Sequence, residues 1–158
     1  HFITQKTARL FSAATEIGAL LENAENYDVK SMSLFGLQLG ITFQIIDDLL
    51  DYEASTDITG KNVGDDLAEG KPTLPLLYAM KKGSNQQKNI IRAAIENGGL
   101  TELESVLNAV RETQALDYVR QLAKEEIEKG EKLIQHITSS VYKDALLALT
   151  QFVTSRDY

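Results

Sequence analysis

The chain has 158 residues, 43% of them hydrophobic, so it is long enough to bury a core and to form one domain. The absence of cysteine excludes disulfides and thiolate metal sites, and a formal net charge of -7 argues against nucleic-acid binding, which needs clustered Lys and Arg. The sequence has no recognisable signal peptide, and no apolar run reaches about 18 residues, the length that spans a bilayer. It therefore predicts a cytoplasmic protein without a transmembrane segment.

Apolar residues recur at helical spacing along almost the whole chain, and no period-two strand pattern appears. The first predicted helix ends near residue 22, and its apolar stripe consists of Phe2, Ile3, Leu10, Phe11, Ala14, Ile17, Leu20 and Leu21. This pattern is already present at residue 1, where no Met starts the chain, so we expect the chain to be a fragment of a longer protein. A second helix is predicted from about residue 29 to residue 52 and ends in "FQIIDDLLDY".

A polar loop with three glycines and many charges is predicted over residues 53–72, and loops of this length are often functional. Five further helices are predicted after it, the fourth of them a long, charge-rich helix over residues 115–136. Their boundaries are marked by Pro75 in a first turn, Gly98 and Gly99 at a C-terminus, a Thr101/Glu104 capping box, and Ser139 or Ser140 before the last helix. These elements predict an all-α bundle.

Three carboxylates, Asp47, Asp48 and Asp51, end the second predicted helix. At about 100° per residue, they and Gln44 lie on one face of this helix, and isoleucines and leucines fill the opposite face. One interpretation is a solvated acidic face on an amphipathic helix. The alternative is a buried helix, because residues 32–46 carry no charge and are apolar around the whole cylinder. The spacing of the aspartates alone favours neither interpretation.

Buried carboxylates crowded into about one turn would need cations beside them, and Asp oxygens suit Mg²⁺, which accepts phosphate oxygens as further ligands. Basic residues favour this interpretation: Lys6 is next to Thr7, Lys61 follows a glycine, and Lys71 precedes Pro72. Each lysine alone is an ordinary surface residue. Together with the aspartates they predict a diphosphate site with metals on one side and ammonium groups on the other.

Three segments, "KTARLF", "FQIIDDLLDY" and "GKNVGDDLAEGKPTLPLLYA", resemble the C-terminal half of trans-type (E) polyprenyl diphosphate synthases, in wording most similar to the bacterial octaprenyl enzymes. The resemblance covers essentially the whole chain. It implies that residues 1–158 are the C-terminal part of a single isoprenoid synthase domain, a helical bundle around a central cavity, in a homodimer. It also implies Mg²⁺-dependent head-to-tail condensation of isopentenyl diphosphate onto an allylic diphosphate such as farnesyl diphosphate, in isoprenoid and ubiquinone biosynthesis. Membrane association would come only through the lipid product.

The resemblance also assigns roles to individual residues. Asp47, Asp48 and Asp51 would be the second aspartate-rich motif, which binds Mg²⁺ on the allylic diphosphate. The expected catalytic residues are Asp47, Asp48 and Lys61. The expected substrate-binding residues are Lys6, Thr7, Phe43, Gln44, Lys61 and Lys71, with Phe43 lining the cavity.

The family's first aspartate-rich motif and its upstream arginines do not occur in this chain. Asp65 and Asp66 do not replace that motif, since they are predicted on a glycine-flanked loop. We therefore expect the isolated chain to be inactive without the missing N-terminal half. Three alternatives remain: a class I terpene cyclase, a non-catalytic subunit of a heteromeric prenyl synthase, and a helical scaffold with solvated acids. Neither His1 nor His136 is expected to bind a metal.

Overall fold

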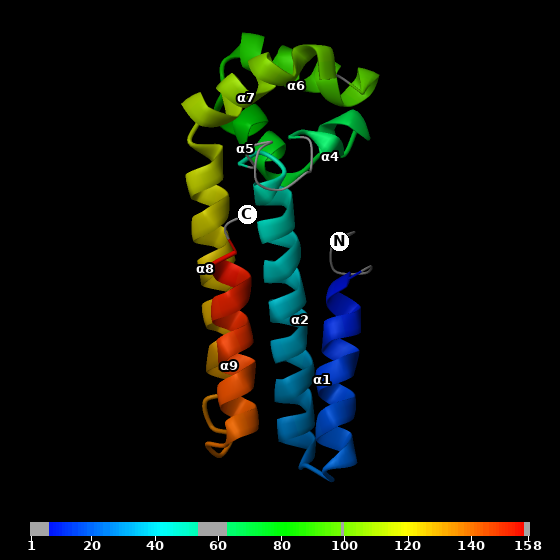
Figure 1. Cartoon of the computed structure of the whole chain (residues 1–158), viewed down its shortest axis with the longest axis vertical. Helices are drawn as coiled ribbons and strands as arrows, with labels where there is room; N and C mark the ends of the chain where they lie inside the picture. Colours follow the sequence, from blue (N-terminus) through cyan, green and yellow to red (C-terminus); the bar gives the residue numbers. More distant parts are fainter. Residues whose placement is uncertain (1–6, 54–62, 99, 157–158) are drawn as a thin grey trace. The chain divides into compact units, whose positions relative to one another are not determined.

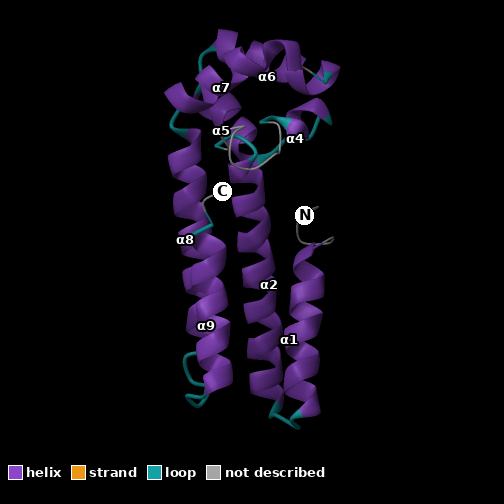
Figure 2. Cartoon of the chain, in the orientation of Figure 1, coloured by secondary structure: helices purple, strands orange, loops and turns teal. Residues whose placement is uncertain are grey.

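The structure is a computed structural model that describes residues 7–53, 63–98 and 100–156. Throughout these ranges the chain is helical or loop and contains no strand, which confirms the predicted all-α class (Figure 2). The chain divides into two compact units, and each is described by itself. The first unit contains the residues up to Ile46 together with Leu122–Arg156, and the second contains Asp47–Gln121. The assignment to a single domain stays a prediction.

Long helices build the first unit (Figure 1): α1 (Arg9–Leu21), most of α2 (Asn26–Leu50), the later part of α8 (Ala115–Leu133) and α9 (Val141–Thr154). α2 and α8 lie close together, because a Cβ added to Gly130 of α8 would be 3.1 Å from the Gln38 side chain of α2. α9 is attached to α8 by the Thr150 hydroxyl, which donates to Glu131 Oε1. The end of α1 and both ends of the other three helices lie within a few residues of the predicted positions, and the predicted start of the first helix lies outside the described residues.

α1 packs on α2 mainly through small and polar residues, and most of its apolar stripe takes no part in this contact. The Thr15 hydroxyl lies 2.7 Å from the Met32 carbonyl oxygen, to which it donates, and the Ser12 and Ser33 hydroxyl oxygens are 3.0 Å apart. A Cβ at Gly40 would lie 2.6 Å from the Cα of Ala8, so the close approach of the two helices requires glycine there. The larger apolar residues on the opposite side of α1 are 54–76% exposed: Leu10, Ile17, Leu20 and Leu21. These four residues of the predicted stripe therefore face away from α2, whereas Phe11 of the same stripe contacts α2 with its ring centroid 5.8 Å from that of Phe43.

The second unit contains α4 (Asp65–Ala68), α5 (Leu74–Lys82), α6 (Asn85–Asn97), the 3₁₀ turn η2 (Leu100–Glu102), α7 (Leu103–Glu112) and the start of α8. Its core includes side chains that are at most 1% exposed: Leu67, Leu76, Ile91, Val106 and Val110. Leu67 explains why a helix forms inside the segment predicted as loop: burying this side chain holds one turn of helix, and Asp65 and Asp66 lie in that turn. The prediction that these two aspartates lie on a loop is therefore wrong.

Most of the predicted helix boundaries are confirmed. Pro75 lies in the first turn of α5, Gly98 ends α6 in the left-handed conformation at φ 64°, and the Ser140 hydroxyl caps α9 by accepting the Lys143 N–H. The predicted Thr101/Glu104 capping box is wrong, because Thr101 is part of η2 and α7 begins after Glu102 without a side-chain cap. The capping box that does form joins Ser84 and Gln87 at the start of α6.

α2 is the one helix in the described ranges that is long and apolar enough, by length and composition, to cross a membrane. The apolar residues are therefore more concentrated in α2 than the prediction of no bilayer-length apolar run implied. Because 44% of its apolar window is buried inside the protein, α2 also has the character of a core helix.

Candidate functional site

The acidic end of α2 is only partly accessible to water. Asp47 and Asp48 in the last turn of α2, and Asp51 directly after it, are all half-buried, whereas Leu49 and Tyr52 are buried. A helix C-terminus carries the negative end of the helix dipole, so carboxylates at this place are electrostatically unfavourable. The acidic cluster, by which we mean Asp47, Asp48 and Asp51, therefore resembles a charge-binding site more than a solvated helix face.

Two carboxylates of the acidic cluster accept backbone N–H groups from segments that follow α2. Asp51 Oδ2 accepts from the Asp66 N–H at 3.2 Å, at the start of α4. Asp48 Oδ2 accepts from the N–H of Leu74, the first residue of α5, at 3.5 Å. The first N–H groups of a helix have no partner within the helix, so a carboxylate there satisfies a free donor. Both side chains are thus directed at helix starts in the second unit.

Negative charge accumulates at this place. Burial raises the pKa of Asp48 to about 6, the Leu74 N–H opposes that rise, and the charges of Asp66, Asp47 and Asp51 add to it. Burial also raises the pKa of Asp51 to about 6, with the charge of Asp66 as the next cause. Among the described residues, no basic group is one of the causes that shift either pKa. A bound cation would supply the missing compensation.

The carboxylate oxygens of the acidic cluster suit Mg²⁺ that completes its coordination with water and substrate phosphate. Within the part of the chain that the structure describes, no three acidic or His side chains converge closely enough to hold a metal ion by themselves. Mg²⁺ rarely uses such an all-protein cage, because it keeps several waters and takes one or two carboxylates together with phosphate oxygens of the substrate. Half-buried carboxylates of the acidic cluster fit that mode of binding.

Two predicted substrate-binding residues, Thr7 and Gln44, are in contact in the first unit, where Thr7 Oγ1 donates to Gln44 Oε1 at 3.3 Å. Phe43 is half-buried, with its ring centroid 5.8 Å from that of Phe11 and 4.9 Å from the guanidinium carbon of Arg156. Sequence reasoning did not find Arg156, because a cation placed over a ring by tertiary packing leaves no local pattern. The two predicted lysines Lys6 and Lys61 lie outside the described residues.

Lys71 is the predicted phosphate ligand that the structure does describe. Its side chain is 53% exposed, and its Nζ lies 2.8 Å from Asp66 Oδ1 and 2.7 Å from Glu69 Oε2. These hydrogen bonds raise the pKa of Lys71, so the ammonium group stays charged. Exposed ion pairs contribute little to stability, so a phosphate group could replace either carboxylate at modest cost.

A buried hydroxyl pair next to the acidic cluster was missed by the sequence analysis. Thr73 Oγ1 donates to Tyr52 Oη at 2.9 Å, and both residues are only 5% exposed. Both residues stand inside the motifs quoted above, but no spacing rule brings together two hydroxyls that are 21 residues apart.

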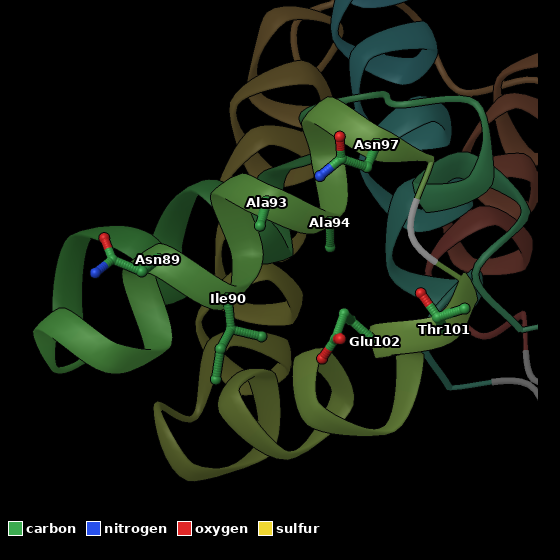
Figure 3. A pocket seen from close by; sticks show the side chains of 7 residues that line it. All are labelled: Asn89, Ile90, Ala93, Ala94, Asn97, Thr101 and Glu102. Carbon is green, nitrogen blue, oxygen red and sulfur yellow. The ribbon is translucent and has the colours of Figure 1, made fainter.

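Figure 3 shows a pocket of about 420 Å³ elsewhere in the second unit. It is lined by Asn89, Ile90, Ala93, Ala94, Asn97, Thr101 and Glu102. None of these residues is basic, and none belongs to the predicted site, so the pocket is not a candidate for a diphosphate.

Comparison with known proteins gives a consistent result. Residues 1–114 match the model of the polyprenyl synthetase family. The chain is 46% identical to an octaprenyl diphosphate synthase of Haemophilus influenzae, over 99% of this chain and 48% of the relative. It is 45% identical to the octaprenyl diphosphate synthase of Escherichia coli (strain K12), over 98% of this chain and 48% of the relative.

Among solved structures, a polyprenyl synthase from Caulobacter crescentus CB15, crystallised with calcium and isoprenyl diphosphate, has a TM-score of 0.88 at 33% identity. That match covers 98% of this chain and 48% of the other. The fold prediction is thereby confirmed, and the chain spans about half the length of the curated relatives it matches.

Proposed function

Because the chain belongs to the polyprenyl synthetase family, we propose that it supplies the allylic-diphosphate and Mg²⁺ part of a polyprenyl diphosphate synthase of the octaprenyl class. The observation that carries this proposal is the half-buried acidic cluster, in which burial and neighbouring carboxylates raise the pKa values of Asp48 and Asp51. The proposed reaction joins isopentenyl diphosphate head-to-tail to an allylic diphosphate such as farnesyl diphosphate. The allylic C–O bond breaks, and a C–C bond forms between the allylic carbon and the alkene of isopentenyl diphosphate. The released diphosphate then takes the proton that the isopentenyl unit loses.

The chain's residues would bind and orient the diphosphate. Asp47, Asp48 and Asp51 would hold the cation, which when bound stabilises the negative charge of the leaving group. The Lys71 ammonium, exposed and permanently charged, is available for a phosphate oxygen. The roles of Thr7 and Gln44 in substrate binding remain predictions from the family resemblance. The roles of Lys6 and Lys61 remain predictions from the family resemblance.

The exposed stripe of α1 supports the proposal that the chain is inactive alone. Leu10, Ile17, Leu20 and Leu21 form an apolar face on one side of a single helix, and exposed faces of this kind mark surfaces that another part covers. Since the chain spans about half the length of its relatives, we propose that the remainder of the synthase fold covers this stripe. A homodimer is part of the same proposal and rests on the family resemblance.

Intact carboxylates favour this function over the alternatives. A non-catalytic synthase subunit has no need for three half-buried acids at a helix end, and a terpene cyclase typically replaces "DDLLD" by a motif that mixes Asn, Ser and Glu. A scaffold with solvated acids does not agree with their burial.

Calorimetric titration of the chain with farnesyl diphosphate, with and without Mg²⁺, tests the proposal. We expect Mg²⁺-dependent binding that is lost when Asp47 and Asp48 are both changed to Asn. The matched control is Asp117→Asn. It removes one charge in the same unit, from a side chain that is 77% exposed. Binding that ignores Mg²⁺ or survives the double change would refute the site. Longer prenyl products formed by the chain alone from labelled isopentenyl diphosphate would refute its inactivity.

A further inference from the structure

The threonine that precedes α5 does not cap the helix. Thr73 is the N-cap residue, and its carbonyl accepts the first helical bond, from the Leu77 N–H at 3.0 Å. A threonine in this position normally accepts an N–H of the first turn with its side-chain oxygen. Here the side chain makes no cap hydrogen bond, and its hydroxyl donates to Tyr52 Oη.

Asp48 accepts a different N–H at the start of α5. Its Oδ2 accepts the Leu74 N–H at 3.5 Å, which is at the long limit for a hydrogen bond and holds a side chain weakly. The position of the carboxylate must therefore be fixed by other contacts. Tyr52 follows Asp48 by four residues, and its ring belongs to the core of the second unit. The Tyr52–Thr73 bond thus ties the segment that carries Asp48 to the residue just before α5.

We propose that Tyr52 and Thr73 are positioning residues, whose buried hydrogen bond holds the Asp48 carboxylate against the start of α5 in the orientation that a Mg²⁺ site requires. This inference rests on the proposed function. The bond acts by joining the segment that carries Asp48 to the residue from which α5 starts.

Cation selectivity distinguishes positioning from mere stabilisation of the fold. Mg²⁺ demands near-ideal octahedral geometry, whereas Ca²⁺ accepts six to eight oxygens in flexible arrangements. A carboxylate that is present but misplaced should weaken Mg²⁺ binding more than Ca²⁺ binding. A fold that is simply less stable should weaken both equally.

The test measures the dissociation constants of Mg²⁺ and of Ca²⁺ for the whole chain by calorimetry, with inorganic pyrophosphate present. Thr73→Val and Tyr52→Phe should each weaken Mg²⁺ binding roughly tenfold, the size typical of lost outer-shell partners. Each should weaken Ca²⁺ binding by much less. Thr73→Ser, which keeps the hydroxyl, should restore Mg²⁺ affinity. The matched control is Thr113→Val, which removes a hydroxyl bonded to the Ala109 and Val110 carbonyls at the end of α7.

Each outcome has one meaning. If the unchanged chain binds Mg²⁺ but both variants bind it equally well, the positioning role is overturned and the proposed function stands. Equal loss for Mg²⁺ and Ca²⁺, or failure of Thr73→Ser to restore binding, also overturns it. Absence of Mg²⁺ binding by the unchanged chain overturns both proposals. Circular dichroism identifies an unfolded variant, and Tyr52→Phe keeps the aromatic ring in the core if Thr73→Val does not fold.

Discussion

Replacing Asp48 by Asn should make the chain more stable and at the same time abolish its Mg²⁺-dependent binding. Burial raises the pKa of Asp48 from 3.8 to about 6, so the folded state favours the neutral form. Asn is nearly isosteric and uncharged, and its side-chain oxygen can still accept the Leu74 N–H. The change therefore removes the unfavourable charge and leaves the hydrogen bond.

The direction with pH follows from linkage. With a raised pKa, the folded state binds more protons than the unfolded state, so stability falls as the pH rises from about 3.8 through about 6 and is constant above. The shift from 3.8 to about 6 corresponds to at most about 3 kcal/mol at 1.36 kcal/mol per pH unit. Because Asp48 is only half-buried, screening by water reduces the expected gain at pH 8 to about 1 kcal/mol.

Urea unfolding followed by circular dichroism, in EDTA at pH 4.5 and pH 8, measures this difference. Asp48→Asn should exceed the unchanged chain in unfolding free energy at pH 8, and the difference should shrink at pH 4.5. Adding Mg²⁺ and pyrophosphate at 100 times the dissociation constant should stabilise only the unchanged chain, by about 2.7 kcal/mol. A variant that is less stable at pH 8, or a difference that is independent of pH, would show that Asp48 is not an uncompensated buried charge.

Three further predictions concern other parts of the chain. Leu10→Lys combined with Leu21→Lys should change the unfolding free energy by no more than about 0.5 kcal/mol, because both side chains are exposed. The double change should also reduce self-association in size-exclusion chromatography. A large loss of stability would show that the chain itself buries this stripe. Ser84→Ala should lower the unfolding free energy by about 1 kcal/mol, because it removes the capping box of α6, whereas Thr101→Ala should not lower it. Equal effects of the two changes in thermal unfolding would contradict the assigned helix starts. Lys71→Ala should change the unfolding free energy by less than about 1 kcal/mol, since the Lys71 side chain in both ion pairs is exposed. The same change should weaken the binding of pyrophosphate in the presence of Mg²⁺ roughly tenfold, measured by calorimetry. Unchanged affinity would show that Lys71 is not part of the site.

Local interactions explain what the sequence determined by itself. The starts of α5 and α9 and the end of α6 could be predicted from the sequence. Pro75, Ser140 and Gly98 mark them, because each acts on backbone groups within about one turn. The common face of Asp47, Asp48 and Asp51 follows from the period of one helix in the same way. The wrong capping box at Thr101 shows the limit of such signals, because the pattern cannot tell a 3₁₀ turn from the first turn of an α-helix.

The tertiary structure decided which distant groups meet. Asp48 reaches the Leu74 N–H across 26 residues, and Tyr52 reaches Thr73 across 21. Amphipathic periodicity would bury the apolar stripe of α1, yet most of that stripe is exposed. The N-cap residue Ala8 packs instead against Gly40 of α2, where the absence of bulky side chains lets the two helices approach closely. Periodicity fixes which residues share a face, but the shape and burial of the opposing surface determine which face is covered and which carboxylates lose their water.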